Sequence, residues 1–520
     1  MNTKWVALGV LAAGLGMIVL DGTIVGVAMP VIIADLKLSL ADAQWVSALY
    51  SVVFAALLLA FGRAGDSWGR KNIFAWGIAI FAVSSVMAAL STGAGMLIWA
   101  RALQGVGGAM VLPSSLSSVN AAFRGAERAV AFGVWGAVMA GVAAVGPLLG
   151  GLICKHWQWQ GIFWVNVPVG ILLLVLTRRF VPNSRGQRGH FDALGVVLSA
   201  LSFGSIVFGI IEGPVVGWLR PKAPLRVGNW VFPEDAALSV SFLALCGGLV
   251  FLILFVTSQV LASRRGGAPL VAPEMFRFRT FSWGNMTALA VAAGEFALIF
   301  VLPLYLLAVA GLDTMGAGWV LAAMAVGAFV SGALARHLSA MIGAAGTVIL
   351  GLVLEFVGVL GLTFDLHLGS SVIAAILAIY GLGLGLASAQ LTSTVLRDIP
   401  PALSGQGAAT QSTFRQLGSA LGTALGGTVL AARLQADVMA QLAKLHLPAA
   451  KAEGLTKMVV DSVGGGIAGM PSSPIRDALQ SGFQAATTAS LYLALVFIGV
   501  GVMGAMRVAK VAKSEVVPKV

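Results

Sequence analysis

The fold of this chain is decided by the stretch Gly62-Arg63-Ala64-Gly65-Asp66-Ser67-Trp68-Gly69-Arg70-Lys71, which carries four charges between two long apolar runs. An apolar run of about 20 residues spans a bilayer as a helix, so the charged stretch predicts a short turn between two membrane helices. Short connections rich in Lys and Arg stay in the cytoplasm. The stretch therefore predicts a cytoplasmic turn in a membrane protein.

The composition predicts a polytopic membrane protein. Of the 520 residues, 58% are hydrophobic and 10% are charged, whereas soluble domains have roughly 25% charged residues. The net charge of +12 would suggest a nucleic-acid partner for a soluble protein, but in a membrane protein the placement of the charges decides, and no such partner is expected. The two cysteines, Cys154 and Cys246, exclude a disulfide framework or a Cys-based zinc site, and no metal site is expected.

Apolar runs of spanning length predict fourteen transmembrane helices. Their ranges are 5–33, 44–62, 73–91, 95–118, 128–152, 162–178, 192–212, 237–261, 281–309, 315–335, 342–363, 370–396, 408–432 and 484–506. An even number of spans places both termini on one face. Most of the Lys and Arg residues lie in the connections on that face, so both termini are predicted to be cytoplasmic.

The spans fall into groups of six, two and six. Residues 1–180 are predicted to form an N-terminal six-helix bundle, and 181–263 to add two helices with cytoplasmic linkers. Residues 264–520 are predicted to form a C-terminal six-helix bundle that includes an outer loop, 433–483. The leucines of this loop have helical spacing. A surface helix that extends the thirteenth span is therefore favoured, and the alternative is a lid over a binding site.

Several motifs resemble those of the major facilitator superfamily. The opening stretch is similar to the G-x-x-x-D-x-x-G-R-K loop between the second and third helices of that family, with Ser67 where the family usually has a basic residue. The run Gly146-Pro147-Leu148-Leu149-Gly150-Gly151 resembles the antiporter motif on the fifth helix. The stretch from Leu20 to Pro30 resembles the first-helix motif of the fourteen-helix drug:proton antiporter branch. The resemblance implies the major facilitator fold and multidrug efflux, which confers antibiotic resistance.

Ionisable residues inside the spans are the candidates for coupling, because a charge at the bilayer centre costs at least ~2.5 kcal/mol. Asp21 and Arg101 lie at similar depths and can pair if their helices adjoin. A buried carboxylate that gains or loses a partner can switch between charged and neutral forms, as proton coupling requires. We predict Asp21, Arg101 and Glu295 as proton-coupling residues, with the proton as coupling ion and no other cofactor. The alternatives are a structural Asp21, an Arg101 that reaches the outer surface, and a Glu295 that only bonds a neighbouring helix.

The sequence Arg101-Ala102-Leu103-Gln104-Gly105 also resembles the fourth-helix motif of the superfamily. The resemblance implies that its arginine takes part in proton transfer.

The predicted substrate-binding residues are Glu295, Phe300, Tyr305 and Glu355. An acid among aromatic rings offers a lipophilic cation both a counter-charge and a cation–π surface. Glu355 has no supporting motif, and a protonated glutamate that serves helix packing is the favoured alternative there.

The predicted gating residues are Gly62, Asp66, Gly69, Arg70, Lys71, Gly146, Pro147, Gly150, Gly151 and Arg415. Asp66 and Arg70 can form a charge-paired latch; the alternative is a solvated loop that only sets topology. The Gly-Pro run can bend and pack closely, or it can be a static kink. For Arg415, an ion pair between the bundles and a contact with substrate are both open.

No zinc-protease, serine-hydrolase or Walker motif is present in the sequence, so neither an enzyme nor an ATP-driven pump is expected. We expect a monomeric secondary transporter in the bacterial cytoplasmic membrane. It would export lipophilic or cationic small molecules in exchange for protons by alternating access. The alternative is an exporter or symporter of one specific metabolite, amino acid or lipid.

Overall fold

The computed structural model describes residues 3–185, 192–227, 230–267, 269–366, 369–400 and 403–514, which leaves part of the first predicted linker, 186–191, outside the described residues. The helices are α1 (Thr3–Leu36), α2 (Leu40–Trp68), α3 (Arg70–Ala89), α4 (Ala94–Ala122), α5 (Gly125–His156), α6 (Gly161–Trp164), α7 (Asn166–Phe180), α8 (Ala193–Val216), α9 (Val240–Arg264), η1 (Pro273–Arg277), α10 (Arg279–Ala308), α11 (Thr314–Asp365), α12 (Ser370–Val395), α13 (Ser404–Ala443), α14 (Ala449–Asp461), α15 (Gly465–Ala468) and α16 (Pro474–Ser514). Strands β1 (Leu225–Val227) and β2 (Trp230–Phe232) form a small antiparallel hairpin between α8 and α9.

The described helices supply the predicted spans. Twelve described helical segments are long and apolar enough to cross a membrane, and α11 is one of them. The 52 residues of α11 would measure about 78 Å as one helix, far more than the about 30 Å of a bilayer core. Gly343, with a φ of 77°, divides α11 into two spans, and α5 is a further 32-residue helix. The predicted all-α polytopic fold is therefore confirmed.

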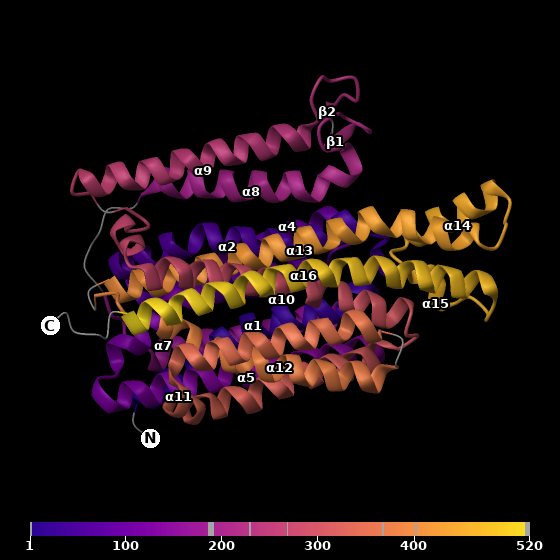
Figure 1. The fold of residues 1–520 in the computed structure, drawn as a ribbon. Helices are drawn as coiled ribbons and strands as arrows, with labels where there is room; N and C mark the ends of the chain where they lie inside the picture. Colours follow the sequence, from indigo (N-terminus) through magenta and orange to yellow (C-terminus); the bar gives the residue numbers. More distant parts are fainter. Residues whose placement is uncertain are drawn as a thin grey trace.

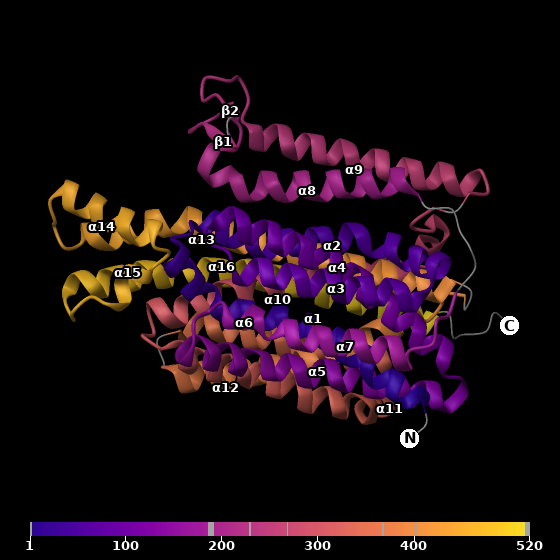
Figure 2. The ribbon, with the colours of Figure 1, turned by 180° about the vertical axis from the view of Figure 1, so that it is seen from behind.

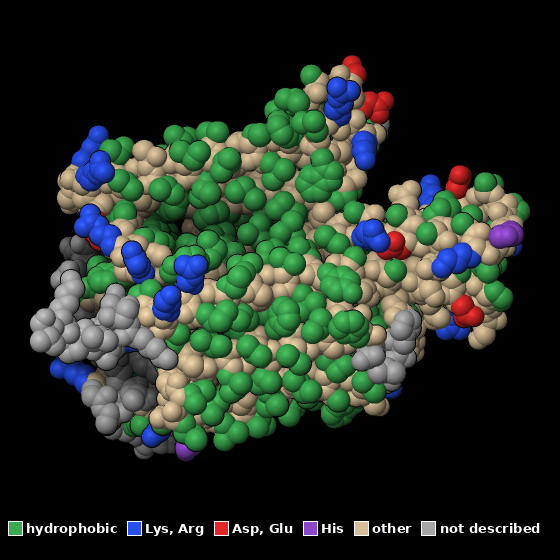
Figure 3. Space-filling model, in the orientation of Figure 1, with side chains coloured by type: hydrophobic (Ala, Val, Ile, Leu, Met, Phe, Trp, Pro, Cys, Tyr) green, Lys and Arg blue, Asp and Glu red, His purple; other side chains and the backbone are tan. Residues whose placement is uncertain are grey.

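The long helices run side by side, and α1 begins at the end of the bundle where α16 ends (Figure 1). Figure 3 shows apolar side chains over the middle of one face, with Lys and Arg gathered towards the ends. An apolar band between charged ends fits a bilayer. The end that carries the junction of α2 and α3 is the cytoplasmic end by the charge rule, and we call the opposite end the outer end.

The predicted turn at 62–71 is wrong in extent, because nearly all of it is helical. α2 continues to Trp68 and α3 begins at Arg70, so Gly69 alone separates the two helices. Gly69 has a φ of 101°, and a side chain there would collide with Asn183, so the position requires glycine. A one-residue junction keeps the charged residues on helices rather than in a flexible loop.

The predicted outer loop, 433–483, is largely helical. α13 continues to Ala443, and α14, α15 and the start of α16 fold back beside it, so that this part projects from the outer end (Figure 1). Leu434, Val438 and Leu442 are buried in one apolar cluster with residues of α14 and α16. The predicted helical extension of the thirteenth span is confirmed.

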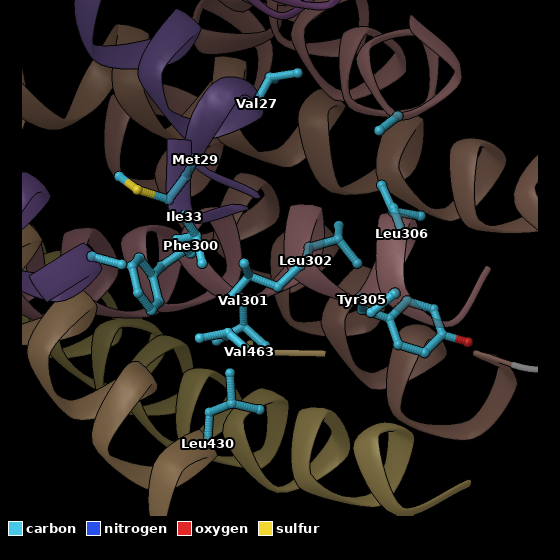
Figure 4. Close-up of a cluster of buried hydrophobic side chains, with 14 of the residues drawn as sticks. Val27, Met29, Ile33, Phe300, Val301, Leu302, Tyr305, Leu306, Leu430 and Val463 are labelled. Carbon is cyan, nitrogen blue, oxygen red and sulfur yellow. The ribbon is translucent and has the colours of Figure 1, made fainter. Parts of the chain in front are cut away.

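Helices α1–α7 form one group and α10–α16 another, and α5 contacts α11 while α2 contacts α13. Near the outer end a large apolar cluster joins the groups. In it Met29 and Ile33 of α1 lie with Phe300 and Leu302 of α10 and Leu430 of α13 (Figure 4). The outer ends of the two groups are therefore closed against each other.

The α8/α9 hairpin lies beside the bundle, over the seam between α2 and α13 (Figures 1 and 2). Val207 and Ile211 of α8 pack in one cluster with Ala48 of α2 and Ala424 of α13. The hairpin thus contacts both groups of helices at once.

Two hydrogen bonds fix the hairpin on this seam. Trp45 Nε1 of α2 donates to Glu212 Oε1 of α8 at 2.7 Å. Thr428 Oγ1 of α13 donates to the backbone oxygen of Ile210 at 2.9 Å. That oxygen is free because Pro214, four residues later in the same helix, has no N–H to donate. Each group of helices therefore holds α8 through a polar side chain as well as through apolar contact.

Candidate functional site

Asp21 of α1 is the centre of a buried polar cluster. Its carboxylate receives a hydrogen bond from Arg101 Nη1 of α4, from Gln104 Nε2 at 3.1 Å and from Asn166 Nδ2 of α7 at 3.0 Å. The structure thus brings Asp21 and Arg101 together, as their similar depths allow. Three donors around one carboxylate stabilise its ionised form.

Arg101 is held on its other sides as well. Its Nε donates to the Val46 backbone oxygen of α2 at 3.2 Å, and its Nη1 donates to Gln104 Oε1 at 2.6 Å. Its guanidinium carbon lies 4.4 Å from the centre of the Tyr50 ring, within cation–π distance. Since the side chain is buried and its partners are internal, the alternative of an arginine that reaches the outer surface does not apply.

Sequence reasoning missed the neutral members of this cluster. Gln104 Nε2 and Asn166 Nδ2 also donate to Ser85 Oγ of α3, at 2.9 and 3.3 Å. The available signal was weak: Gln104 lies three residues after Arg101 and therefore on the same side of α4. Asn166 and Ser85 gave no such signal, because only the packing of α7 and α3 against α1 places them here.

A second polar site lies within the group α10–α16, beside the contact of α13 with α2. Glu295 Oε2 of α10 is 3.5 Å from Arg415 Nη2 of α13, so this ion pair joins two helices of one bundle and not the two bundles. On α13, Ser419 meets Ser51 of α2 at 3.1 Å, and Gly422 touches the α10 backbone. Arg415 is one turn from Ser419 and so points between the two groups.

The exposure of Arg415 is informative, because its side chain is 48% exposed while that of Glu295 is 9% exposed. Arg415 lies 11 residues from the start of α13, or about 16 Å from its cytoplasmic end. The guanidinium of Arg415 is therefore half-exposed at a depth where its partner carboxylate is buried.

Phe300 and Tyr305 do not join Glu295 in a cation site, which corrects that prediction. Both are buried in the apolar cluster at the outer end (Figure 4). Tyr305 Oη donates to the Leu366 backbone oxygen at 2.7 Å. The two rings therefore close the outer end in this state.

Glu355 is also misplaced as a substrate ligand. It is 0% exposed, and neither carboxyl oxygen has a hydrogen-bond partner among the described residues. The same holds for the hydroxyl of Tyr380 on α12. Glu355 therefore lines no open space in this state.

Asp66 and Arg70, the residues of the predicted cytoplasmic latch, form an ion pair in the structure. Arg70 Nη2 is 2.8 Å from Asp66 Oδ1 across the Gly69 junction, and Arg70 Nη1 donates to the Ser117 backbone oxygen of α4 at 3.0 Å. Lys71 Nζ donates to the Arg178 backbone oxygen at the end of α7 at 2.8 Å. The remaining member, Gly62, lies in ordinary contact with α4. The stretch thus ties α2 and α3 to α4 and α7.

The Gly-Pro run packs α5 between two helices. Gly146 and Gly150 lie against Thr23 and Ile24 of α1, and a side chain at Gly151 would meet the backbone of α11. On the other side, Gly318 of α11 lies against the Pro147 backbone oxygen. Close approach of helix backbones, rather than a kink alone, explains these small residues.

An ion pair crosses the same seam at the outer end. Lys155 Nζ of α5 is 2.9 Å from Asp313 Oδ2, and Asp313 also caps α11 by accepting from the Gly316 backbone N–H at 2.7 Å. These two bonds lower the pKa of Asp313, the bond from Lys155 most of all.

Comparisons with known proteins agree with this architecture. The family profile described as Major Facilitator Superfamily matches residues 11–423. The multidrug efflux pump LfrA of Mycolicibacterium smegmatis is 32% identical over 92% of this chain and 89% of its own length. The riboflavin transporter RibZ of Clostridioides difficile is 30% identical over 84% of this chain and 90% of its own. A crystal structure of a bacterial homolog of the human lysosomal transporter Spinster covers 100% of both chains with a TM-score of 0.60 and 16% identity, a likeness of fold.

Proposed function

Because the chain belongs to the major facilitator superfamily, we propose that it is a proton-coupled exporter of lipophilic or cationic small molecules in the bacterial cytoplasmic membrane, active as a monomer. The single observation that carries the coupling is the buried carboxylate of Asp21 with its three donors. The kind of cargo is supported by relatives such as LfrA, whose name describes multidrug efflux.

Protonation of Asp21 would change the forces between three helices. Arg101, Gln104 and Asn166 donate to the ionised carboxylate from α4 and α7. A neutral carboxyl group binds these donors more weakly, and it leaves Arg101 as a buried charge without a counter-charge. The proton would therefore favour a different packing of α1 against α4 and α7, which is the link between proton binding and alternating access.

The present state would load cargo from the cytoplasm. The outer end is closed by the apolar cluster and by Lys155–Asp313, whereas the half-exposed Arg415 supports a space open toward the cytoplasm. At the wall of that space, Glu295 offers a counter-charge to a cationic cargo when Arg415 turns away. A proton on Glu295 would oppose such a cargo, as antiport requires.

The test uses the full chain in proteoliposomes with an imposed pH gradient and ethidium as the cationic probe. Wild-type protein should move ethidium against its gradient, and Asp21→Asn should lose this coupled movement while it still folds, with a lower free energy of unfolding because Arg101 loses its counter-charge. The matched control is Glu453→Gln, which removes an exposed carboxylate from α14 and should behave as wild type. Coupled transport by Asp21→Asn at the wild-type rate would refute the proposal.

The alternative of one specific metabolite is favoured by the similarity to RibZ, a riboflavin transporter by name. The same proteoliposomes separate the two functions when ethidium and riboflavin are offered together. Transport of riboflavin that ethidium cannot inhibit would favour the single-metabolite function.

A further inference from the structure

We propose that the carboxyl group of Glu355, buried where α11 packs against Gly383 of the neighbouring helix α12, is a second proton-binding site. It would bind and release one proton in each transport cycle. This inference rests on the proposed proton-coupled transport and adds a proton to the one carried by Asp21. The two sites lie in different groups of helices.

The geometry requires that Glu355 is neutral in the present state. Both Glu355 and Tyr380 are fully buried. Neither the two carboxyl oxygens nor the phenolic oxygen has a hydrogen-bond partner among the residues that the structure describes. An ionised carboxylate cannot be kept in a membrane interior without donors or a counter-charge. The group is therefore held as the acid, which means that it carries a proton.

Helix packing does not explain the acid. A protonated glutamate that joined two helices would donate to an acceptor on the partner helix, and Glu355 has none among the described residues. The close approach of α11 and α12 comes from glycines, since Gly351 and Gly383 touch across the interface and Gly358 lies against the Tyr380 backbone. A leucine or methionine would fill the same place without a buried polar group, so the carboxyl group calls for another role.

The charged groups that interact with Glu355 are Glu295 and Arg415, the ion pair that joins α10 and α13. Arg415 is half-exposed and can approach Glu355 once it leaves Glu295. Ionisation of Glu355 is favoured only in a state that brings Arg415 or water to it. Release of its proton is therefore tied to the movement of α13 relative to α11.

The other elements around α11 add no competing charge at this depth. α12 contributes Tyr380, which is neutral. α16 has no Asp, Glu, Lys or Arg between Asp477 and Arg507, and α5 has none between Arg128 and Lys155. α1 contributes Asp21, whose charge is already paired with that of Arg101. Arg415 is thus the cation available to an ionised Glu355.

The first test is direct detection of the proton by infrared difference spectroscopy of purified full-length protein during a pH titration. A carboxylic acid without a hydrogen bond has a distinct carbonyl band. We expect this band in the wild type and in Asp21→Asn, and its loss in Glu355→Gln. Glu453→Gln should leave the band unchanged. An unchanged band in Glu355→Gln overturns the proposal.

The second test is the proton-to-ethidium ratio, measured as the ethidium gradient that just balances an imposed pH gradient in proteoliposomes. Glu355→Gln should retain coupled transport with one proton fewer per ethidium, whereas Asp21→Asn should lose coupling altogether. An unchanged ratio in Glu355→Gln contradicts the second site. A wild type without any coupling would instead contradict the proposed function, while the infrared band would still report on Glu355. If Glu355→Gln fails to fold, wild-type protein with isotope-labelled glutamate decides: a band that does not shift with the label overturns the assignment.

Discussion

Asp21 of α1 and Arg101 of α4 form an ion pair whose side chains are 0% and 3% exposed. Taking two charges out of water costs several kcal/mol per ion, and attraction between them offsets this only when further hydrogen bonds are present. Here Gln104 and Asn166 donate to the carboxylate, and the Val46 backbone oxygen accepts from Arg101. The pair is thus held by side chains and backbone from four helices, and a change in its charge acts on all of them.

Removal of Arg101 should destabilise the protein when Asp21 is present and much less when Asp21 is also replaced. Arg101→Gln leaves Asp21 as an uncompensated buried charge, so the free energy of unfolding should fall by about 3–5 kcal/mol. Asp21→Asn combined with Arg101→Gln removes both charges and should recover most of that loss. Unfolding of the purified variants in detergent measures the cycle. Additive losses in the double variant would show that the two residues do not depend on each other.

Gln104 should be needed for efficient coupled transport. Gln104→Leu removes one donor to the Asp21 carboxylate and one donor to Ser85, so gradient-driven ethidium transport should slow by roughly tenfold, as expected for the loss of one charge-assisted hydrogen bond. Ser84→Ala is the control, because the hydrogen bonds of Ser84 stay within α3. Transport by Gln104→Leu at the wild-type rate would contradict the role of Gln104 as a donor.

The outer ion pair should not act as a pH sensor. The hydrogen bond from Lys155 and then that from the Gly316 N–H hold the pKa of Asp313 below its ordinary value. A lowered pKa stabilises the closed outer end at every pH above the ordinary value for Asp, about 3.9, and this stabilisation is lost only as the pH falls through the lowered value.

Asp313→Asn should therefore weaken outer closure by the same small amount at pH 5.5 and pH 7.5. The side chains of Lys155 and Asp313 are 46% and 56% exposed, and such pairs contribute about 0–1 kcal/mol. The measurement is the distance between spin labels on the outer ends of α5 and α11, with Lys155→Gln as the matched variant. A change of label distance between the two pH values that the wild type shows and Asp313→Asn lacks would contradict the prediction.

Thr428 should contribute to stability only because Pro214 leaves the Ile210 backbone oxygen without a donor in α8. Thr428→Val leaves the Ile210 backbone oxygen without its donor and should lower the free energy of unfolding by about 1–3 kcal/mol. In a Pro214→Ala background the N–H of residue 214 bonds that oxygen within α8, so Thr428→Val should then have little effect. Equal losses in both backgrounds would show that the hydrogen bond is not what holds α8 on α13.

The sequence predicts most of the fold because apolar length and the placement of Lys and Arg carry that information directly. It also places Asp21 and Arg101 at one depth, and only the adjacency of α1 and α4 had to be supplied by the structure. Gln104, Asn166 and Ser85 were missed because neutral polar residues are common in membrane helices, and their shared target appears only when four helices are packed.

Helix geometry explains why Phe300 does not lie beside Glu295, contrary to the prediction from the sequence. Five residues along an α-helix turn the side chain by about 140°, so Phe300 points away from the face of Glu295. The opening stretch was misread for a different reason. Charge indicated a turn, but Asp66 and Arg70 pair one helical turn apart, and Gly69 is enough to change direction.

Because of the α8/α9 hairpin, the two seams between the helix groups differ in their exposure to lipid. The hairpin covers the seam between α2 and α13 at two levels, because Val207 and Ile211 pack toward the outer end and Val196 packs against Leu59 of α2 nearer the cytoplasmic end. The described helices place no such cover on the seam between α5 and α11. Lipid therefore meets the bundle directly along α5 and α11, whereas on the opposite side it meets the hairpin first. Substitutions on the lipid-facing side of α9 should accordingly leave the contact between the two helix groups undisturbed.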